Sequence, residues 1–334
     1  MSRHSTVLIL GARGRLGLAA ARAFAQAGWH VIGLIRPGAV APDLPGVEWL
    51  AHDLRDTAGL AVAARGARVV VHALNPAYTV AAWRDEAPGL MDAALALATE
   101  LRATLMFPGN VYNYGEGMPA TLQESTPQQA RHELGRIRVA LEQKMARAVE
   151  DSGSAMRAVV LRAGNFFGAV EGTFLDKMVA PQLPSGKVSW MGDLDASTPW
   201  AYLPDMARTL VMLAERNDLA PFETVHFAGH QVTARDWLAV LTEVAREQGW
   251  LQHGQALTVR RVPVWFFRLF GLVSPTLATI AQTSYLFSKP HRLDNGRLVQ
   301  LLGAEPRTPF ELAVRQSLVE MGLPMATAAP LAMA

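Results

Sequence analysis

The chain has 334 residues, half of them hydrophobic, and carries a formal net charge of only +2. This composition supplies enough apolar side chains for one large core or two coupled lobes, and the small charge gives no reason to expect nucleic-acid binding. The chain contains no cysteine, which excludes disulfides and a thiol nucleophile and fits a reducing compartment. The first apolar run begins at residue 6 and leaves no room for a signal peptide, so we expect a cytoplasmic protein.

The most apolar region covers residues 262–287, but four polar or helix-breaking residues interrupt it: Arg268, Ser274, Pro275 and Gln282. We therefore expect no membrane span. Association of this region with a membrane surface is a weaker alternative than a buried helix. We expect a small molecule as the partner of this chain, and no metal ion.

A glycine-rich loop near the N-terminus follows a short apolar run and precedes a helical one. Its glycines are spaced three apart, at Gly11, Gly14 and Gly17. Gly11 permits a sharp turn, Gly14 lets the backbone approach a pyrophosphate, and Gly17 lets the helix pack closely on the strand. Amide groups at the helix start then face the phosphates, so the loop predicts dinucleotide binding. The side chains expected to contact the cofactor here are Arg13, Arg15 and Leu16.

The first half of the chain alternates between predicted strands and helices. We predict strands over residues 6–10, 30–35, 47–51, 68–73 and 104–107, and helices over residues 15–27, 58–64 and 81–101. These strands are too apolar to leave one face in water, which favours a parallel sheet covered by helices on both faces. After a loop over residues 109–126, a helix is expected to begin at Pro127, capped by Ser125 or Thr126, and to run to about Glu150.

A strand over residues 157–161 follows, and beyond Arg162 the pattern becomes less regular. We predict later strands over residues 225–227 and 258–262, and helices over residues 206–216, 233–248, 296–302 and 308–321. The fold class is therefore α/β, a Rossmann-type doubly wound parallel sheet with a smaller C-terminal substrate lobe. We expect an NAD(P)-binding domain in residues 1–162 and a substrate-binding lobe in residues 163–325, whose strands could interleave with the first domain.

Several short motifs occur in an informative order along the chain. They are the three spaced glycines, Asp53-Leu54, His72-Ala73, Val111-Tyr112, the segment from Leu161 to Gly168, the segment from Tyr202 to Asp205, and the segment from Leu302 to Pro306. Through them, nearly the whole chain resembles the extended or atypical short-chain dehydrogenase/reductases, the NAD-dependent epimerase/dehydratase-like group. The resemblance implies an NAD(P)-dependent oxidoreductase or epimerase and assigns further cofactor contacts to Asp53, Leu54, His72, Ala73 and Arg162.

The choice between NAD and NADP depends on the residue after the second strand. An acidic residue there would favour NAD, because it accepts hydrogen bonds from the ribose 2′-hydroxyl and repels a 2′-phosphate. This chain carries Arg36 instead, and Arg13 precedes the second glycine. Two guanidinium groups can bind one phosphate strongly, so we expect NADP rather than NAD.

The catalytic residues that the family usually carries are missing. Its members use a Tyr-x-x-x-Lys pair on the helix after strand five, and alignment on Glu142 places Leu134 and Arg138 at these two positions. Arg138 can still bind a ribose hydroxyl, but Leu134 cannot transfer a proton. The segment that normally carries a Ser or Thr to orient the substrate reads Pro108-Gly109-Asn110 here.

Other residues of the same loop are candidates for the lost role. Tyr112, Tyr114 and Asn110 lie where the substrate is expected to meet the nicotinamide, and we rank Tyr112 first. His132 is another possible acid or base, although a packed or surface histidine is the preferred interpretation. For each tyrosine, simple packing is the alternative.

The residues expected to contact the substrate are Tyr78, Asn165, Phe166 and Trp200. Thr198 stands where sugar-nucleotide epimerases usually carry an arginine for the diphosphate, so we expect a small, partly apolar substrate. The alternative is a catalytically inactive NADP-binding redox sensor. Apolar residues of the segment 81–101, including Leu90 and Met91, exceed what one sheet-facing stripe needs and predict a homodimer, with burial of these residues within the monomer as the alternative.

Overall fold

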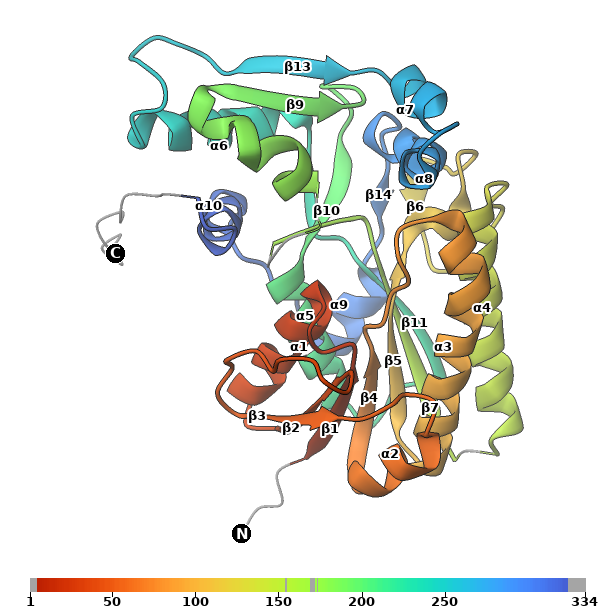
Figure 1. The fold of residues 1–334 in the computed structure, drawn as a ribbon. Coiled ribbons are helices and arrows are strands. Elements are labelled where there is room, and N and C mark those ends of the chain that lie inside the picture. The colour runs from red at the N-terminus through yellow and green to blue at the C-terminus, as the bar shows by residue number, and fades with distance from the viewer. Residues whose placement is uncertain (1–4, 154, 169–171, 173, 324–334) are drawn as a thin grey trace.

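The computed structural model describes residues 5–153, 155–168, 172 and 174–323, so residues 169–171, 173, 324 and 325 of the predicted second lobe lie outside it. At its centre is a parallel sheet of seven strands in the order β11-β7-β5-β4-β1-β2-β3 (Figure 1). The strands are β1 (Thr6–Leu10), β2 (His30–Ile35), β3 (Val47–Ala51), β4 (Ala67–His72), β5 (Thr104–Asn110), β7 (Arg157–Ala163) and β11 (Phe222–Phe227). The predicted α/β Rossmann-type fold is confirmed.

Helices cover both faces of this sheet (Figure 1). One face packs against α1 (Arg15–Gln26), α5 (Leu203–Ala214) and α9 (Gly296–Leu302), and the other against α2 (Thr57–Ala63), α3 (Val80–Glu100) and α4 (Glu133–Asp151). In β1, Val7 and Ile9 join the core on the first side, whereas Leu8 and Leu10 join the core on the second. A strand buried on both faces explains why its sequence is continuously apolar.

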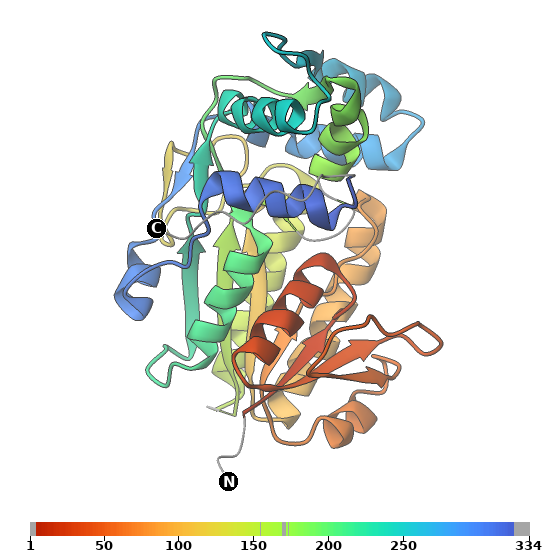
Figure 2. The ribbon, with the colours of Figure 1, turned by 90° about the vertical axis from the view of Figure 1, so that its left-hand side faces the viewer.

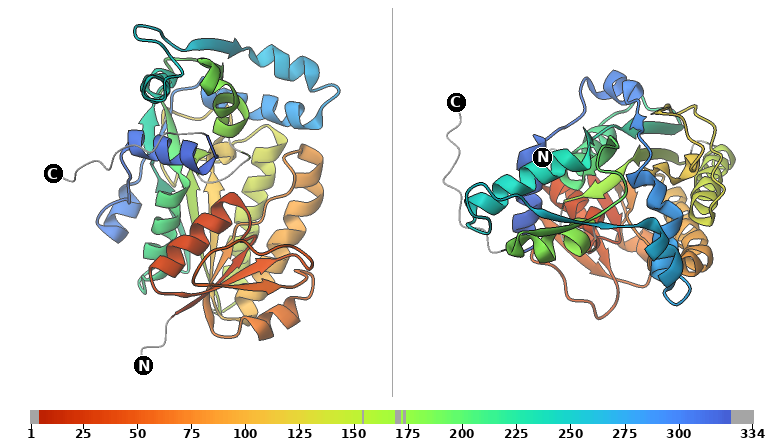
Figure 3. Two further views of the ribbon diagram at one scale, coloured as in Figure 1. Left: turned by 60° about the vertical axis from the view of Figure 1, so that its left-hand side comes forward. Right: turned by 90° about the horizontal axis from the view of Figure 1, so that it is seen from above.

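A smaller lobe lies over the carboxyl ends of the parallel strands, as Figures 2 and 3 show. Its strands are β8 (Asn165–Phe167), β10 (Thr198–Tyr202) and β12 (His230–Val232) in one sheet, β9 (Lys187–Met191) with β13 (Thr258–Val262), and β6 (Thr121–Leu122) with β14 (Arg292–Leu293). Its helices are α6 (Ala234–Glu247), α7 (Val264–Phe270), α8 (Pro275–Thr283) and α10 (Phe310–Glu320), with short turns η1 (Val111–Tyr114), η2 (Leu175–Val179), η3 (Ala180–Ser185) and η4 (Ser284–Phe287). No helix in the described part of the chain is long and apolar enough to cross a membrane.

Two predicted helix starts are wrong. Helix α4 begins at Glu133 rather than Pro127, and its cap is His132, whose Nδ1 accepts a hydrogen bond from the amide of Gly135 at 3.1 Å. Thr126 cannot cap it because its hydroxyl accepts from the Gln123 amide at 2.8 Å and closes a separate turn. Helix α5 also begins earlier than expected, at Leu203.

The central sheet contains a strand from late in the chain. Strand β11 pairs in parallel with β7 along its whole length, from Phe222 beside Ala158 to Phe227 beside Ala163. The sheet is therefore completed by residues that follow β8 and β10 of the smaller lobe. The functional division into residues 1–162 and 163–325 stays a prediction.

Candidate functional site

The glycine loop between β1 and α1 lies against the end of β4. Gly11 has a φ of +77°, and a Cβ at this position would lie 2.9 Å from the carbonyl oxygen of Ala73. A Cβ on Gly17 would lie 2.2 Å from the carbonyl oxygen of Gly11, so α1 can start this close to β1 only with glycine there. The amide of Gly14 donates to the Gly11 carbonyl at 2.9 Å. The loop thus has the close backbone packing that a dinucleotide phosphate site requires.

A cavity of about 1140 Å³ opens from this loop along the carboxyl ends of the strands. The predicted cofactor residues that line it are Gly11, Arg13, Gly14, Arg15, Leu16, Arg36, Asp53, Leu54, His72, Ala73 and Arg138. Gly17 lies beneath the loop, where it permits the close packing of α1. We call this space the cofactor cavity.

Two arginines stand at the end of the cofactor cavity that follows β2. Arg13 and Arg36 are both exposed, and neither side chain has a hydrogen bond or ion pair within the described residues. The carboxylate of Asp53 forms an ion pair with Arg55, with a nitrogen–oxygen distance of 2.6 Å. Hydrogen bonds from Arg55 lower the pKa of the Asp53 carboxyl to about 2. Arg13 and Arg36 therefore supply the uncompensated positive charge at this end.

Arg138 reaches from α4 into the cofactor cavity and is buried there. Its guanidinium carbon lies 4.7 Å from the ring centroid of Trp83 and 4.9 Å from that of Phe107. Its Nη1 donates to the carbonyl oxygen of Pro108 at 3.1 Å, but Nε is buried without a partner in the described chain. Burial lowers the pKa of Arg138 to about 10, so the group stays charged at neutral pH. An unused charged donor suits a ribose hydroxyl.

His72, at the end of β4, is the second buried group with an unused polar atom. Its ring packs against Phe107 with 5.3 Å between the centroids, and its Nδ1 has no partner among the described residues. Burial, with a smaller contribution from the charge of Arg138, lowers the pKa of His72 to about 3 and keeps it neutral. Two orphaned polar atoms in one cavity indicate that its occupant is polar, as a nicotinamide dinucleotide is.

Tyr112 lies in η1, directly after β5. The side chain of Asn110 accepts from the Tyr112 amide at 3.0 Å and so holds the turn. The Tyr112 hydroxyl is 3.0 Å from the hydroxyl of Tyr78, which is 3.2 Å from Oγ1 of Thr283 in α8. Burial and Tyr78 raise the pKa of Tyr112 well above its ordinary value, and the charge of Arg138 opposes this rise. Tyr112 is therefore a protonated phenol at neutral pH.

Arg15 brings a positive charge from the glycine loop toward the two tyrosines. Burial lowers the pKa of its guanidinium, and favourable interactions with Asp176, Tyr112 and Tyr78 oppose that change. The tyrosine pair therefore lies within the electrostatic influence of cations on two separate elements, Arg15 of α1 and Arg138 of α4.

The first turn of α4 packs on η1 without supplying an acid. Leu134 is fully buried. A Cβ on Gly135 would lie 2.4 Å from the carbonyl oxygen of Tyr112, so glycine is needed for this contact. Nε2 of His132 lies 3.2 Å from the hydroxyl of Tyr285 in η4. His132 is thus a packed, helix-capping residue.

Tyr114 and Arg162 lie in a buried network behind η1, and not in the cofactor cavity. Arg162 Nη1 donates to the Tyr114 hydroxyl at 2.7 Å, and this hydroxyl lies 2.8 Å from Nε2 of His226. Arg162 also forms a buried ion pair with Glu142 at 2.5 Å, and Glu142 accepts from Asn113 of η1 at 2.9 Å. Because these partners occupy both side chains, the network holds η1 in position rather than contacting the cofactor.

The predicted substrate residues lie in different surroundings. Phe166 lines the cofactor cavity, and the neighbouring Asn165 has a buried Nδ2 without a partner in the described chain. Trp200 lies in the aromatic core, 5.0 Å from Trp237 between centroids, and its Nε1 donates to Thr198 at 3.0 Å. Trp200 therefore supports the smaller lobe from within.

Sequence reasoning missed the contribution of α8. Thr279 and Thr283 are both buried, and the hydroxyl of Thr279 accepts from the amide of Val80 at 3.1 Å. These contacts fasten α8 over the start of α3 and beside Tyr78. Two threonines four positions apart in an apolar helix lie on the same face, and this spacing could have indicated a polar contact on that face of α8.

Solved structures of similar fold include enzymes that bind nicotinamide cofactors. A putative epimerase from Burkholderia cenocepacia J2315 is 18% identical, with 95% of this chain and 97% of that chain covered and a TM-score of 0.65. A UDP-glucuronic acid 4-epimerase from Bacillus cereus, in complex with NAD, is 15% identical, with 94% and 98% covered and a TM-score of 0.72. At such identities the likeness concerns the fold alone.

A search of curated proteins gave no match. The model of the "NAD dependent epimerase/dehydratase family" matches residues 7–226, which is well over half of the chain. This match confirms the resemblance drawn from the motifs and supports a nicotinamide dinucleotide as the cofactor. The chain belongs to the NAD dependent epimerase/dehydratase family.

Proposed function

We propose that the protein is an NADP-dependent oxidoreductase or epimerase-like enzyme that acts on a small, partly apolar substrate and uses Tyr112 as its proton donor. The observation that carries this proposal is the pairing of the Tyr112 and Tyr78 hydroxyls at 3.0 Å near two cations of the cofactor cavity. The pair supplies a phenol, the chemical group that is missing from α4 because Leu134 stands at the position of the family tyrosine.

The preference for NADP rests on Arg13 and Arg36, two exposed arginines of the cofactor cavity whose side chains have no partner in the described chain. Similar structures were solved with NAD, as in the Bacillus cereus epimerase. A 2′-phosphate would give these two guanidinium groups a doubly charged partner, whereas a plain ribose would leave them unpaired.

The proposed chemistry divides between three side chains. When bound, the nicotinamide ring exchanges a hydride with a substrate carbon. Arg138 binds the neighbouring ribose through its unused Nε–H, as the family lysine does. Tyr112 donates a proton to the substrate oxygen, and Tyr78 and Thr283 hold its hydroxyl in place. At neutral pH the phenol of Tyr112 is protonated and can donate to the oxygen of a carbonyl that is being reduced, and the charge of Arg138 favours this transfer because it opposes the rise in the pKa of Tyr112.

The substrate is proposed to differ from those of the similar solved structures, two of which contain UDP-glucuronic acid or UDP-glucose with NAD. Thr198 is buried and accepts a hydrogen bond from Trp200, so this position offers no cation for a diphosphate. Phe166 gives the cofactor cavity an apolar wall.

The test is NADPH consumption by the full chain with a panel of small aldehydes and ketones that carry apolar substituents. We expect turnover that is lost in Tyr112→Phe and retained in Tyr202→Phe, a change in the smaller lobe. Tight NADP binding without turnover on any compound would instead favour the redox sensor, for which the buried Leu134 is the supporting observation.

The oligomeric state and the location of the protein stay predictions. Met91 and four other apolar residues of α3 (Ala94, Leu95, Leu97 and Ala98) are buried within the single chain, and Leu90 lines the cofactor cavity. The surplus apolar surface that favoured a homodimer is therefore absent from the described part of α3, and a dimer now rests on the family resemblance. A cytoplasmic location rests on the sequence alone.

A further inference from the structure

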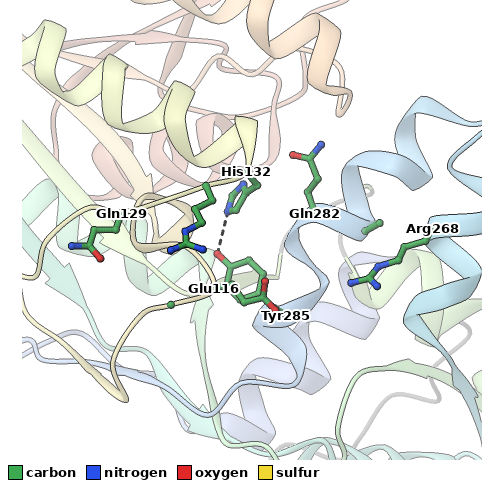
Figure 4. A pocket seen from close by; sticks show the side chains of 9 residues that line it. Glu116, Gln129, His132, Arg268, Gln282 and Tyr285 are labelled. Carbon is green, nitrogen blue, oxygen red and sulfur yellow. Dashed lines mark hydrogen bonds between the residues drawn. The ribbon is translucent and has the colours of Figure 1, made fainter.

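A second cavity, of about 920 Å³, has none of its lining residues in common with the cofactor cavity. It is bounded by the segment over residues 116–132 on one side and by α7, α8 and η4 on the other (Figure 4). In Figure 4, Arg268 extends from α7 toward the side on which Tyr285 lies. We call this space the lateral cavity, and the polar side chains that line it include Glu116, Arg131, His132, Arg268, Gln282 and Tyr285.

The hydrogen bonds of His132 determine what Tyr285 can offer to the lateral cavity. Nδ1 of His132 accepts from the Gly135 amide at 3.1 Å, so in the neutral ring the proton is on Nε2. Burial lowers the pKa of His132, which favours this neutral form. Nε2–H then donates to the Tyr285 hydroxyl at 3.2 Å, and the phenolic proton of Tyr285 is left to donate elsewhere. Burial raises the pKa of Tyr285, so that proton is retained.

The charges around the lateral cavity are predominantly positive. Arg131 and Arg268 line it, and their side chains have no hydrogen bond or ion pair within the described residues. Lys289 adds a third cation close by, because its Nζ donates to the backbone carbonyl of Glu116 at 2.6 Å. The carboxylate of Glu116 is the single acidic side chain among the described lining residues. Two arginines against one carboxylate leave a net positive cavity.

Gln282 provides an independent sign that a polar ligand belongs here. Its Oε1 is buried and has no partner among the described residues, although the side chain lines the lateral cavity. An orphaned buried amide atom is costly unless a ligand completes its hydrogen bonds. Rotation of the carboxamide can present either its oxygen or its two N–H donors to that ligand.

We propose that the lateral cavity binds a small oxyanion, a carboxylate or phosphate group of a small metabolite. Arg131 and Arg268 supply the charge, and the Tyr285 hydroxyl and the Gln282 amide supply neutral donors. The cavity adjoins the proposed reaction centre, because the rings of His132 and Tyr112 lie 6.2 Å apart between centroids. An anionic group of the substrate is therefore the natural occupant, and this last step rests on the proposed function.

The test is calorimetric titration of the full chain with two probes, inorganic phosphate and malonate. Arg131→Gln and Arg268→Gln are each expected to weaken binding about tenfold or more, and Tyr285→Phe several-fold, because charge-assisted contacts are the stronger ones. Arg260→Gln, on the exposed surface of β13, is the matched control and is expected to leave the affinity unchanged. Thermal unfolding of each variant checks that the fold is retained.

Binding of either probe that depends on Arg131 and Arg268 supports the site, and the probe that binds identifies phosphate or carboxylate as the preferred class. If neither probe binds at about 10 mM, a concentration well above the millimolar range of weak ligands, the proposal is overturned. Binding that is insensitive to these two arginines but lost in Arg36→Gln also overturns it, because the anion then occupies the cofactor cavity. NADP affinity is measured separately. The binding of the oxyanion probes can therefore still be interpreted if the proposed function is wrong.

Discussion

The hydroxyl oxygens of Tyr78 and Tyr112 lie 3.0 Å apart, although the two residues are 34 positions apart and follow different strands of the sheet. Tyr78 follows β4, Tyr112 follows β5, and the carboxyl ends of these neighbouring parallel strands bring them together. Thr283 of α8 fixes Tyr78 from the smaller lobe. The pair therefore joins both parts of the molecule at the place where substrate and cofactor are proposed to meet.

Removal of the Tyr112 hydroxyl should abolish most of the catalytic rate. We expect Tyr112→Phe to lower kcat about 100-fold or more, since a positioned acid contributes about 10²–10⁴-fold. Tyr78→Phe should have a smaller effect, because it removes the group that orients the acid rather than the acid itself. Steady-state NADPH oxidation with any active substrate measures both. A Tyr112→Phe variant that keeps the wild-type rate would exclude this residue as the donor.

Substitution of Arg36 should reduce the discrimination between the two cofactors. We expect Arg36→Ala and Arg13→Ala each to weaken NADP binding by about 1.5–3 kcal/mol, the range for a hydrogen bond to a charged group, with little change for NAD. Fluorescence titration with both cofactors measures the difference. Arg65→Ala, an exposed arginine after α2, is the control. Equal affinity of the wild-type chain for NADP and NAD would contradict the assignment.

Arg138 should matter to cofactor binding through both its charge and its unused donor. Arg138→Ala should weaken NADP binding about tenfold or more, because a charged contact is lost. Arg138→Lys restores the charge at the position of the family lysine, and we expect it to recover part of that affinity. The same titrations measure both variants. If Arg138→Ala binds NADP as tightly as wild type, the guanidinium does not contact the cofactor.

The buried histidine of the network behind η1 should make the protein less stable in acid. His226 Nδ1 lies 3.2 Å from the Leu122 carbonyl oxygen, so it carries the proton, and Nε2 accepts from the Tyr114 hydroxyl. Burial, with the charge of Arg162, lowers the pKa of His226 to about 4 in the folded state. The unfolded chain, with a histidine pKa of about 6.5, takes up the proton first as the pH falls. Stability is then full above about pH 6.5 and is lost toward pH 4, by about 3 kcal/mol.

Urea unfolding at a series of pH values between these limits measures this loss. In His226→Gln, which cannot be protonated, the free energy of unfolding should depend less steeply on pH. His253→Gln removes an exposed histidine and should retain the wild-type slope. Parallel pH profiles for wild type and His226→Gln would show that His226 contributes nothing to the acid sensitivity.

Local sequence patterns determined much of the sheet and its phosphate loop. The bounds predicted for the first three strands agree with β1, β2 and β3, and those of β13 and α9 also agree. These elements depend on apolar runs and on glycines whose effects are local. The same reasoning predicted that Gly11 and Arg36 lie at one edge of the sheet, because the carboxyl ends of parallel strands meet there, and both line the cofactor cavity. Arg138 was assigned from the family resemblance.

The amino-acid sequence was therefore sufficient to predict the family, the parallel sheet and the edge of the sheet at which the cofactor is expected. The tertiary structure alone decided that Arg162 pairs with Glu142, that His132 caps α4, and that Thr283 reaches Tyr78, 205 positions away. A hydrogen bond or an ion pair between distant residues depends on how whole helices pack, and no local spacing or propensity records that packing. For this reason the sequence could not distinguish Tyr112 from Tyr114, which lie two residues apart in one turn. Only the folded chain shows that Tyr112 contacts Tyr78 whereas Tyr114 contacts His226.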